Sequence, residues 1–95
     1  MEAYTFQRTD LASRQLGADE RRRLEAVLAE QGAVQIDLGN VESISESFAD
    51  ELFGILVRDK GLDFVTACVK ITHASESALR SIAIAMHRRS SQVAA

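Results

Sequence analysis

Hydrophobic residues recur along this chain in two spacings, one typical of strands and the other of helices. Residues 33–38 alternate, with Val34, Ile36 and Leu38 on one face, and glycines stand on either side of them, which predicts a half-buried strand. Residues 65–71 alternate in the same way and predict another strand. A further short strand is predicted over residues 4–9, where aromatic and β-branched residues open the segment.

Three helices are predicted between these strands. The first covers about Asp19 to Glu30, and its start at Ser13 or at Asp19 stays open because Gly17 is either a break or a costly interior residue. The second begins near Ser47 and ends at residues 60–61. The third follows Ser75, its predicted N-cap, and ends around residues 88–89. The residues expected to face the core are Leu24, Val27 and Leu28 in the first helix, Phe48, Ala49, Leu52, Phe53, Ile55, Leu56 and Val57 in the second, and Ala78, Leu79, Ile82, Ala83 and Met86 in the third.

The order of strands and helices predicts an α/β fold. Strands that alternate with helices form a mainly parallel or mixed sheet with right-handed crossovers, here packed with about three helices. A chain of 95 residues is long enough for one hydrophobic core and too short for two. We therefore expect a single domain over residues 1–95, with its core over about 4–89 and a loose tail over 90–95.

Composition narrows the possible partners. The chain has 11 basic and 14 acidic residues, a net charge of −3, which argues against binding to nucleic acid or to an anionic membrane. The single cysteine, Cys68, has no partner for an internal disulfide, and no leader or apolar run of 18 residues is present, so a cytoplasmic location is expected. No glycine-rich phosphate loop or metal-binding spacing occurs, and no cofactor or metal is expected.

Two further groups of residues indicate ordinary structural roles. Cys68 and His73 are five positions apart on or next to one predicted strand, so their side chains are expected on opposite faces and a nucleophile–base pair is excluded. The consecutive arginines of residues 21–23 spread around most of a helix and cannot form one compact patch, which favours a solvated helix surface.

The segment from Val34 to Gly54 carries the most specific pattern. An apolar strand ends in Asp-Leu, a Gly-x-Val-x-x-Ile link follows, and Ser-Phe-Ala-Asp-Glu-Leu-Phe-Gly opens a helix. This pattern resembles the STAS-like family of unknown function, and the likeness extends from about Ser13 to Arg89. That family is related to the STAS domains of bacterial anti-sigma-factor antagonists. The resemblance implies a small α/β domain that works by binding another protein.

The same resemblance points to Ser47. In the antagonists, a kinase with a GHKL-type ATP-binding fold phosphorylates a serine at the start of a helix, and the phosphate changes partner binding. When Ile44 is aligned with the isoleucine that comes before that serine in the antagonists, Ser47 corresponds to the phosphoacceptor serine. Ser45 and Phe48 then stand where the antagonists have Asp and Gly. Any phosphate there would be favoured by the helix dipole and repelled by nearby acidic residues.

A structural role for Ser47 is also predicted. Ser47-x-x-Asp50 is a variant of the capping box, in which the hydroxyl accepts a hydrogen bond from a backbone N–H of the first helical turn. We expect this to be its main role, with any phosphoacceptor role additional. Loss of the hydroxyl in Ser47→Ala would then cost about 1 kcal/mol.

Acidic residues are concentrated in the centre of the chain. Seven carboxylates and two cations lie between residues 37 and 63. They are expected to be mostly a solvated helix face, with a docking face for a basic partner and a hard-cation site as alternatives. The predicted partner-binding surface consists of Ser43, Ser45, Glu46, Asp50 and Glu51.

Together these observations predict a STAS-like protein-interaction module of bacterial signalling that is not an enzyme. The resemblance implies a GHKL-type ATPase or kinase as partner, with Ser47 as the modified residue. The alternative is a structural homodimerisation module without a switch, in which Gly54 on the solvent face of the central helix permits close approach of a second copy. A small-ligand or nucleotide binder is a third and weaker interpretation. Self-association is expected because a small domain has little core, and because Ile84 falls outside the inward stripe of the last helix.

Overall fold

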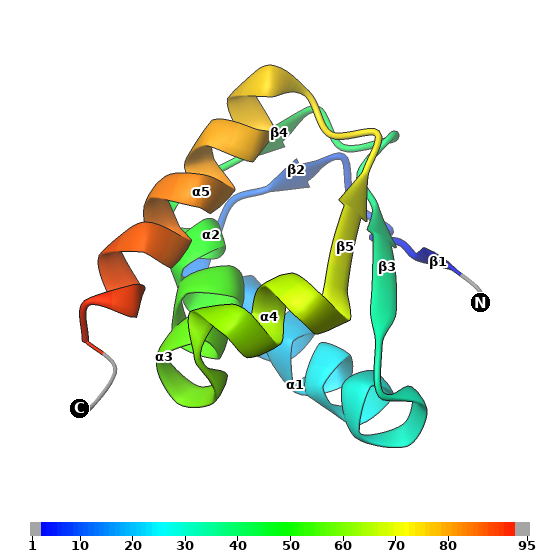
Figure 1. Cartoon of the computed structure of the whole chain (residues 1–95). Helices are drawn as coiled ribbons and strands as arrows, with labels where there is room; N and C mark the ends of the chain where they lie inside the picture. Colours follow the sequence, from blue (N-terminus) through cyan, green and yellow to red (C-terminus); the bar gives the residue numbers. More distant parts are fainter. Residues whose placement is uncertain (1–2, 93–95) are drawn as a thin grey trace.

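The computed structural model describes residues 3–92 and contains two small parallel sheets (Figure 1). The larger has the order β1-β3-β5, formed by Ala3–Tyr4, Val34–Asp37 and Val69–Thr72. The smaller pairs β2, Asp10–Leu11, with β4, Ser43–Ile44. Every pairing between strands is parallel, so the predicted α/β class is confirmed.

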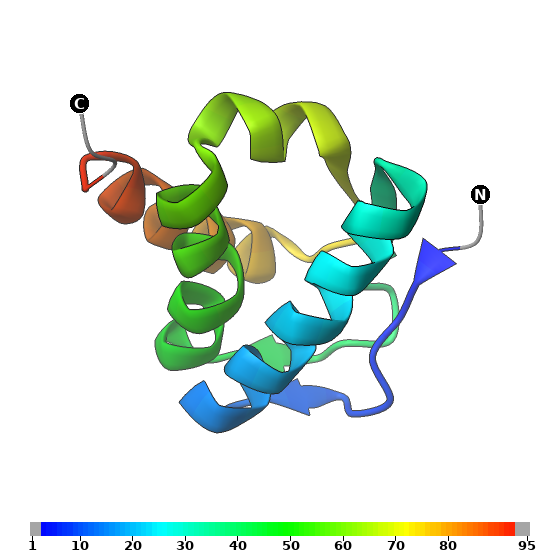
Figure 2. The same cartoon turned by 90° about the horizontal axis from the view of Figure 1, so that it is seen from below.

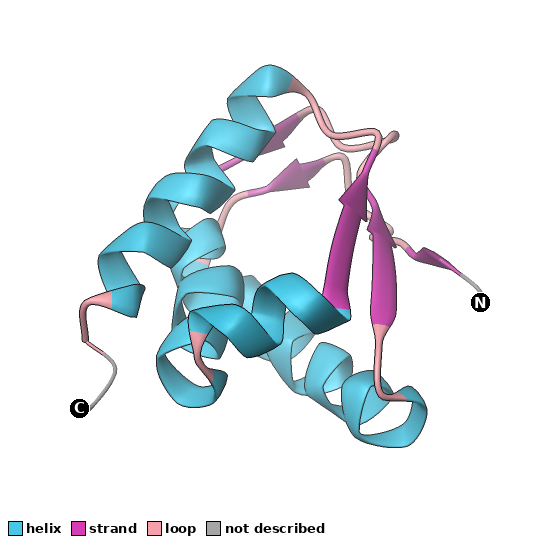
Figure 3. Ribbon diagram, in the orientation of Figure 1, coloured by secondary structure: helices cyan, strands magenta, loops and turns pink. Residues whose placement is uncertain are grey.

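The helices lie together beside the larger sheet, whose strands occupy the other side of the molecule in Figure 3. They are α1 (Arg14–Gln31), α2 (Glu46–Ala49), the π-helical turn η1 (Asp50–Gly54), α3 (Ile55–Lys60), α4 (Leu62–Cys68) and α5 (Glu76–Ser90). α2, η1 and α3 follow one another without a gap and form one central helix, residues 46–60. The π turn divides this central helix, and such turns occur often at functional sites.

Helix α1 begins at the earlier of the two predicted positions. Ser13 is its N-cap and accepts a hydrogen bond from the backbone N–H of Leu16 at 3.0 Å, while Gly32, with φ of 80°, ends it. Gly17 is buried inside the helix against the central helix. A Cβ added there would lie 2.9 Å from the Cβ of Glu51 and 3.0 Å from the carbonyl oxygen of Phe48. Gly17 therefore permits close approach of two helices and is not a break.

The central helix passes between α1 and α5 and supplies more buried hydrophobic residues than any other helix (Figure 2). Phe48, Ala49, Leu52, Phe53, Leu56 and Val57 are fully buried, which confirms the broad apolar stripe predicted from the sequence. Gly54 is also buried, because it faces α5. Its predicted place on the solvent face of this helix is therefore wrong.

The predicted strand over residues 65–71 is wrong in its first half. Residues 62–68 form α4, and the strand β5 starts only at Val69. Gly61, with φ of 93°, ends α3 and redirects the chain, and the following turns bury Val65 while Phe64 stays 40% exposed. The predicted strand over residues 4–9 is likewise reduced to β1, because the backbone leaves the sheet after Tyr4.

Helix α5 begins after Ser75, whose hydroxyl accepts a hydrogen bond from the N–H of Ala78 at 3.1 Å, so the predicted N-cap is confirmed. Its inward face is partly different from the prediction: Ala78, Ile82 and Ala85 are buried, whereas Leu79 is 46% exposed and Ala83 is exposed. The predicted tail starts too early, since Ser90 is the last residue of the helix. Residues 93–95 of that tail lie outside the described part of the chain.

Candidate functional site

The start of the central helix is fixed by Ser45. Its backbone N–H donates to the carbonyl of Leu11 at 2.8 Å, which continues the pairing of β4 with β2 up to the helix. Its hydroxyl accepts from the N–H of Phe48 at 3.0 Å and donates to the carbonyl of Ala12 at 2.9 Å. Ser45 is therefore the N-cap, and it also ties the helix to the chain that enters α1.

The predicted cap at Ser47 is wrong. The strand pairing ends at Ile44, so the helix begins at Glu46 and Ser47 lies within its first turn. The predicted capping box with Asp50 fails for the same reason. Within residues 3–92 the Ser47 hydroxyl makes no hydrogen bond, and the residue is half-buried in a depression lined by Arg14, Glu46, Asp50, Arg88, Arg89 and Gln92. Ser47 thus shares the lining of this depression with three arginines.

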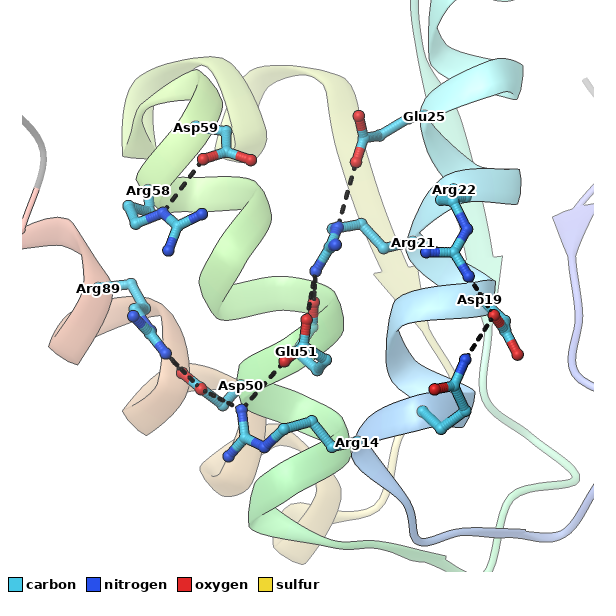
Figure 4. Close-up of polar contacts among 11 residues, drawn as sticks. Arg14, Asp19, Arg21, Arg22, Glu25, Asp50, Glu51, Arg58, Asp59 and Arg89 are labelled. Atoms are coloured by element: carbon cyan, nitrogen blue, oxygen red, sulfur yellow. Dashed lines mark hydrogen bonds and ion pairs between the residues drawn. The ribbon is translucent and has the colours of Figure 1, made fainter.

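Asp50 is held by arginines from two other helices (Figure 4). Arg89 of α5 donates from Nε to Oδ1 at 2.8 Å and from Nη2 to Oδ2 at 2.7 Å, and Arg14 of α1 donates to Oδ2 at 3.0 Å. The hydrogen bonds from Arg89, supported by Arg14 and opposed by partial burial, lower the pKa of Asp50 to about 2. This carboxylate is charged and paired at neutral pH.

Glu51 is paired in the same way with α1. Its carboxylate accepts from Arg14 at 3.1 Å and from Arg21 at 2.7 Å, and Arg21 also contacts Glu25. Partial burial acts to raise the pKa of Glu51, but the hydrogen bonds from Arg21 and Arg14 together outweigh it, so the pKa is lowered. The π turn is therefore clamped on both sides, by α1 and by α5 (Figure 4).

These ion pairs change the interpretation of the acidic centre. Asp50 and Glu51 were expected to present negative charge at the surface, but their side chains are only 20% and 17% exposed and are paired with arginines. Ser43 donates to the carboxylate of Asp10 at 2.7 Å, and Ser45 is the cap. Glu46 is the remaining member of the predicted partner-binding surface, and it is exposed.

The sequence interpretation missed Arg14 and Arg89. They lie 36 and 39 residues from Asp50, and no local spacing links them to it. Arg21 was expected on a solvated surface, yet its side chain is only 16% exposed. Arg21, Arg22 and Arg23 contact different carboxylates, which confirms that they do not form one patch.

The remaining candidate groups are separate from this site. His73 contacts the Asp37 carboxylate at 3.2 Å from Nδ1, and Cys68 packs against the core at the end of α4. Among the described residues there is no group of three or more His, Cys, Asp or Glu side chains suited to a metal ion. Within residues 3–92, none of the helices has the length and apolar character needed to cross a membrane.

The two parallel sheets and the helices packed beside them form a small α/β domain. A family model described as a STAS-like domain of unknown function matches residues 21–78, more than half of the chain, and the chain belongs to that family. The match is narrower than the resemblance suggested, and it leaves Arg14, Arg88 and Arg89 outside. The comparisons with curated proteins and with solved structures find no match.

Proposed function

We propose that this domain acts by binding another protein at the start of its central helix, and that phosphorylation of Ser47 regulates this binding. The observation that carries the proposal is the position of Ser47. Its hydroxyl is not used as the helix cap, and it lies in a depression with Arg14, Arg88 and Arg89. Arginines are the residues that proteins use most often to bind a phosphoryl group through several hydrogen bonds.

The ion pairs reduce the expected conflict between a phosphate and the nearby acids. Asp50 and Glu51 are already neutralised by arginines, so their repulsion of a phosphate on Ser47 is weakened. Arg88 makes no ion pair within residues 3–92, although Glu46 and Asp50 line the same depression. Phosphorylation adds a charge of about −1.5 to −2, so it would convert a basic depression into a neutral or acidic one. A binding partner would meet a different surface.

The surroundings of Ser47 also suit access by a kinase. Phe48 directs its side chain into the core and is fully buried, so the ring does not cover the neighbouring hydroxyl from outside. In the transfer, the bond from Ser47 Oγ to phosphorus forms while the bond between the γ-phosphoryl group and ADP breaks. The hydroxyl proton passes to the kinase. By family resemblance, the partner that transfers the phosphoryl group from ATP is a GHKL-type ATPase or kinase of a bacterial signalling pathway, and the domain itself binds and does not catalyse.

The alternative of a structural homodimer loses its argument from Gly54. That residue is buried and faces α5 within the same chain, with the Ala85 carbonyl oxygen 3.2 Å from a Cβ built on it. It offers no surface for a second copy.

The chain contains a matched control for a phosphorylation test. Ser75-Glu76-Ser77 opens α5 as Ser45-Glu46-Ser47 opens the central helix, with the first serine of each as N-cap and the third residue in the first turn. Ser77→Ala therefore removes a hydroxyl from the same helical position as Ser47→Ala.

The test incubates the GHKL-type ATPase of the same genome with ATP and with wild type, Ser47→Ala, Ser47→Glu or Ser77→Ala. Mass spectrometry is expected to find one phosphate on wild type and on Ser77→Ala, and none on Ser47→Ala. The affinity for the ATPase is expected to change in Ser47→Glu. Equal binding by every variant without phosphate transfer to wild type would reject the switch.

A further inference from the structure

One face of α5 carries a basic and apolar stripe. Arg80, Ile84 and Arg88 are spaced four residues apart, so they follow one another along the same side of the helix. Ile84 is 43% exposed. These three residues line a hollow together with Ser81, Ala85, Glu46 and Asp50, so the stripe forms one wall of a concave surface between α5 and the start of the central helix.

The two arginines of this stripe differ from Arg89. Arg89 pairs with Asp50, whereas neither Arg80 nor Arg88 contacts a carboxylate within residues 3–92. Helix α5 contains three arginines and one glutamate, although the whole chain has a net charge of −3. The helix is therefore a basic element on an acidic protein, and within residues 3–92 the charges of Arg80 and Arg88 take no part in an ion pair.

The arrangement of charge and apolar surface selects one kind of ligand. A partner complementary to the stripe has an apolar group opposite Ile84 and a carboxylate toward each arginine. The separation of Arg80 and Arg88 by eight residues corresponds to about 12 Å along a helix. An amphipathic helix offers this spacing when acidic residues seven or eight positions apart flank apolar ones. A nucleic acid fits less well, because the apolar centre of the stripe gives it no partner and the net charge of the protein repels it.

We infer that the stripe formed by Arg80, Ile84 and Arg88 binds an acidic amphipathic helix of a partner protein. This inference rests on the proposed function and names the chemistry of its partner. The hollow beside the stripe and the depression around Ser47 share Glu46, Asp50 and Arg88, so the two are continuous. A phosphate on Ser47 would compete with the partner for Arg88, and phosphorylation therefore weakens the binding of an acidic helix.

The test selects binders without assuming their charge. The full-length protein is used to select from a displayed library of helical peptides of about 20 residues, whose outward positions are fully randomised. The enriched peptides are expected to carry two acidic residues seven or eight positions apart with leucine, isoleucine or phenylalanine between them. Fluorescence anisotropy then measures the affinity of the best labelled peptide for wild type and variants.

Arg80→Glu and Arg88→Glu are each expected to weaken that affinity by about tenfold or more, and Ile84→Ser by a similar factor. Arg22→Glu is the matched control, because Arg22 is 62% exposed on α1 and the substitution changes the net charge equally. Its affinity is expected to stay within about twofold of wild type. Circular dichroism checks that every variant is folded.

Several results would overturn the inference. They are enrichment of basic or uncharged peptides, failure to enrich any peptide, or an equal loss of affinity in Arg22→Glu. A wild-type dimer in sedimentation that Ile84→Ser dissociates would place a second copy on the stripe and also overturn it. Protein carrying phosphoserine at position 47 separates the two proposals. If the phosphorylated protein binds the acidic peptide as tightly as wild type, the proposed regulation by Ser47 is wrong and the proposed binding site on α5 is retained. If no acidic peptide is enriched, the proposed binding site on α5 is wrong and the phosphate-transfer test is unaffected.

Discussion

Gly54→Ala tests the close contact between the π turn and α5. A Cβ at this position would lie 2.7 Å from Oδ1 of Asp50, 2.9 Å from Cγ of Arg89 and 3.2 Å from the carbonyl oxygen of Ala85. Real Cβ atoms essentially never come within 3.0 Å of another group, so Asp50 and Arg89 must move. Their two hydrogen bonds, at 2.8 and 2.7 Å, would be distorted or lost.

The expected effect is the difference of two opposing contributions. Alanine is favoured over glycine inside a helix by about 0.5–1 kcal/mol. Against this, loss of a mostly buried charged pair costs about 1–2 kcal/mol, and separation of two packed helices costs about 1–3 kcal/mol. The net loss of unfolding free energy is therefore about 1–4 kcal/mol, and the clash outweighs the gain in helix propensity.

Urea denaturation followed by circular dichroism measures this loss for wild type, Gly54→Ala, Asp50→Ala and the double variant. In the double variant the nearest contact is absent, so its loss is expected to be smaller than the sum of the two single losses. A Gly54→Ala protein as stable as wild type, or more stable, would show that η1 and α5 do not approach as closely as described and would refute the reasoning.

The remaining predictions concern the helix start and the ion pairs. Ser45→Ala is expected to lower the free energy of unfolding by about 1–2 kcal/mol, because it removes the cap of Phe48 and the bond to Ala12, whereas Ser47→Ala is expected to change it by less than about 0.5 kcal/mol. Denaturation midpoints of the two variants measure these losses. A larger loss in Ser47→Ala than in Ser45→Ala would show that Ser47 is the N-cap. The second prediction follows from the low pKa of Asp50, which is about 2 in the fold against 3.8 in a free side chain. Its stabilising contribution is fully present above about pH 4 and is lost as the pH falls toward 2. Stability of wild type is therefore expected to fall more steeply over that range than that of Asp50→Asn, and parallel curves in acid titrations would contradict the assignment.

Local sequence patterns were sufficient to predict the strand and helix whose hydrophobic residues pack on a single side against the core. The alternation of Val34, Ile36 and Leu38 predicted β3 correctly, and Ser75 was recognised as the cap of α5. The same alternation gave a wrong prediction of a strand at residues 65–68, because Leu62, Val65 and Cys68 also fit a helical spacing. The chain changes direction at Gly61, and the residues that follow form a helix.

The candidate site was less accessible to sequence reasoning than the fold. Strands β2 and β4 have two residues each, too few to leave a pattern, and their pairing moves the cap from Ser47 to Ser45. The clamp on Asp50 joins residues from the two ends of the chain, and only the packing of three helices brings them together. The family itself was predicted correctly, because the residues that carry its pattern are contiguous in the sequence.

The π turn at Asp50–Gly54 makes the length of the central helix critical. A π turn accommodates one residue more than an α turn, so this segment is equivalent to an α-helix with a single-residue insertion. Deleting one residue here would let the helix revert to regular α geometry, in which each residue turns the chain by about 100°. One end of the helix would then rotate by that angle relative to the other. If Leu56 stayed in the core, Phe48 would turn away from it, so a one-residue deletion is expected to be far more damaging here than a conservative substitution.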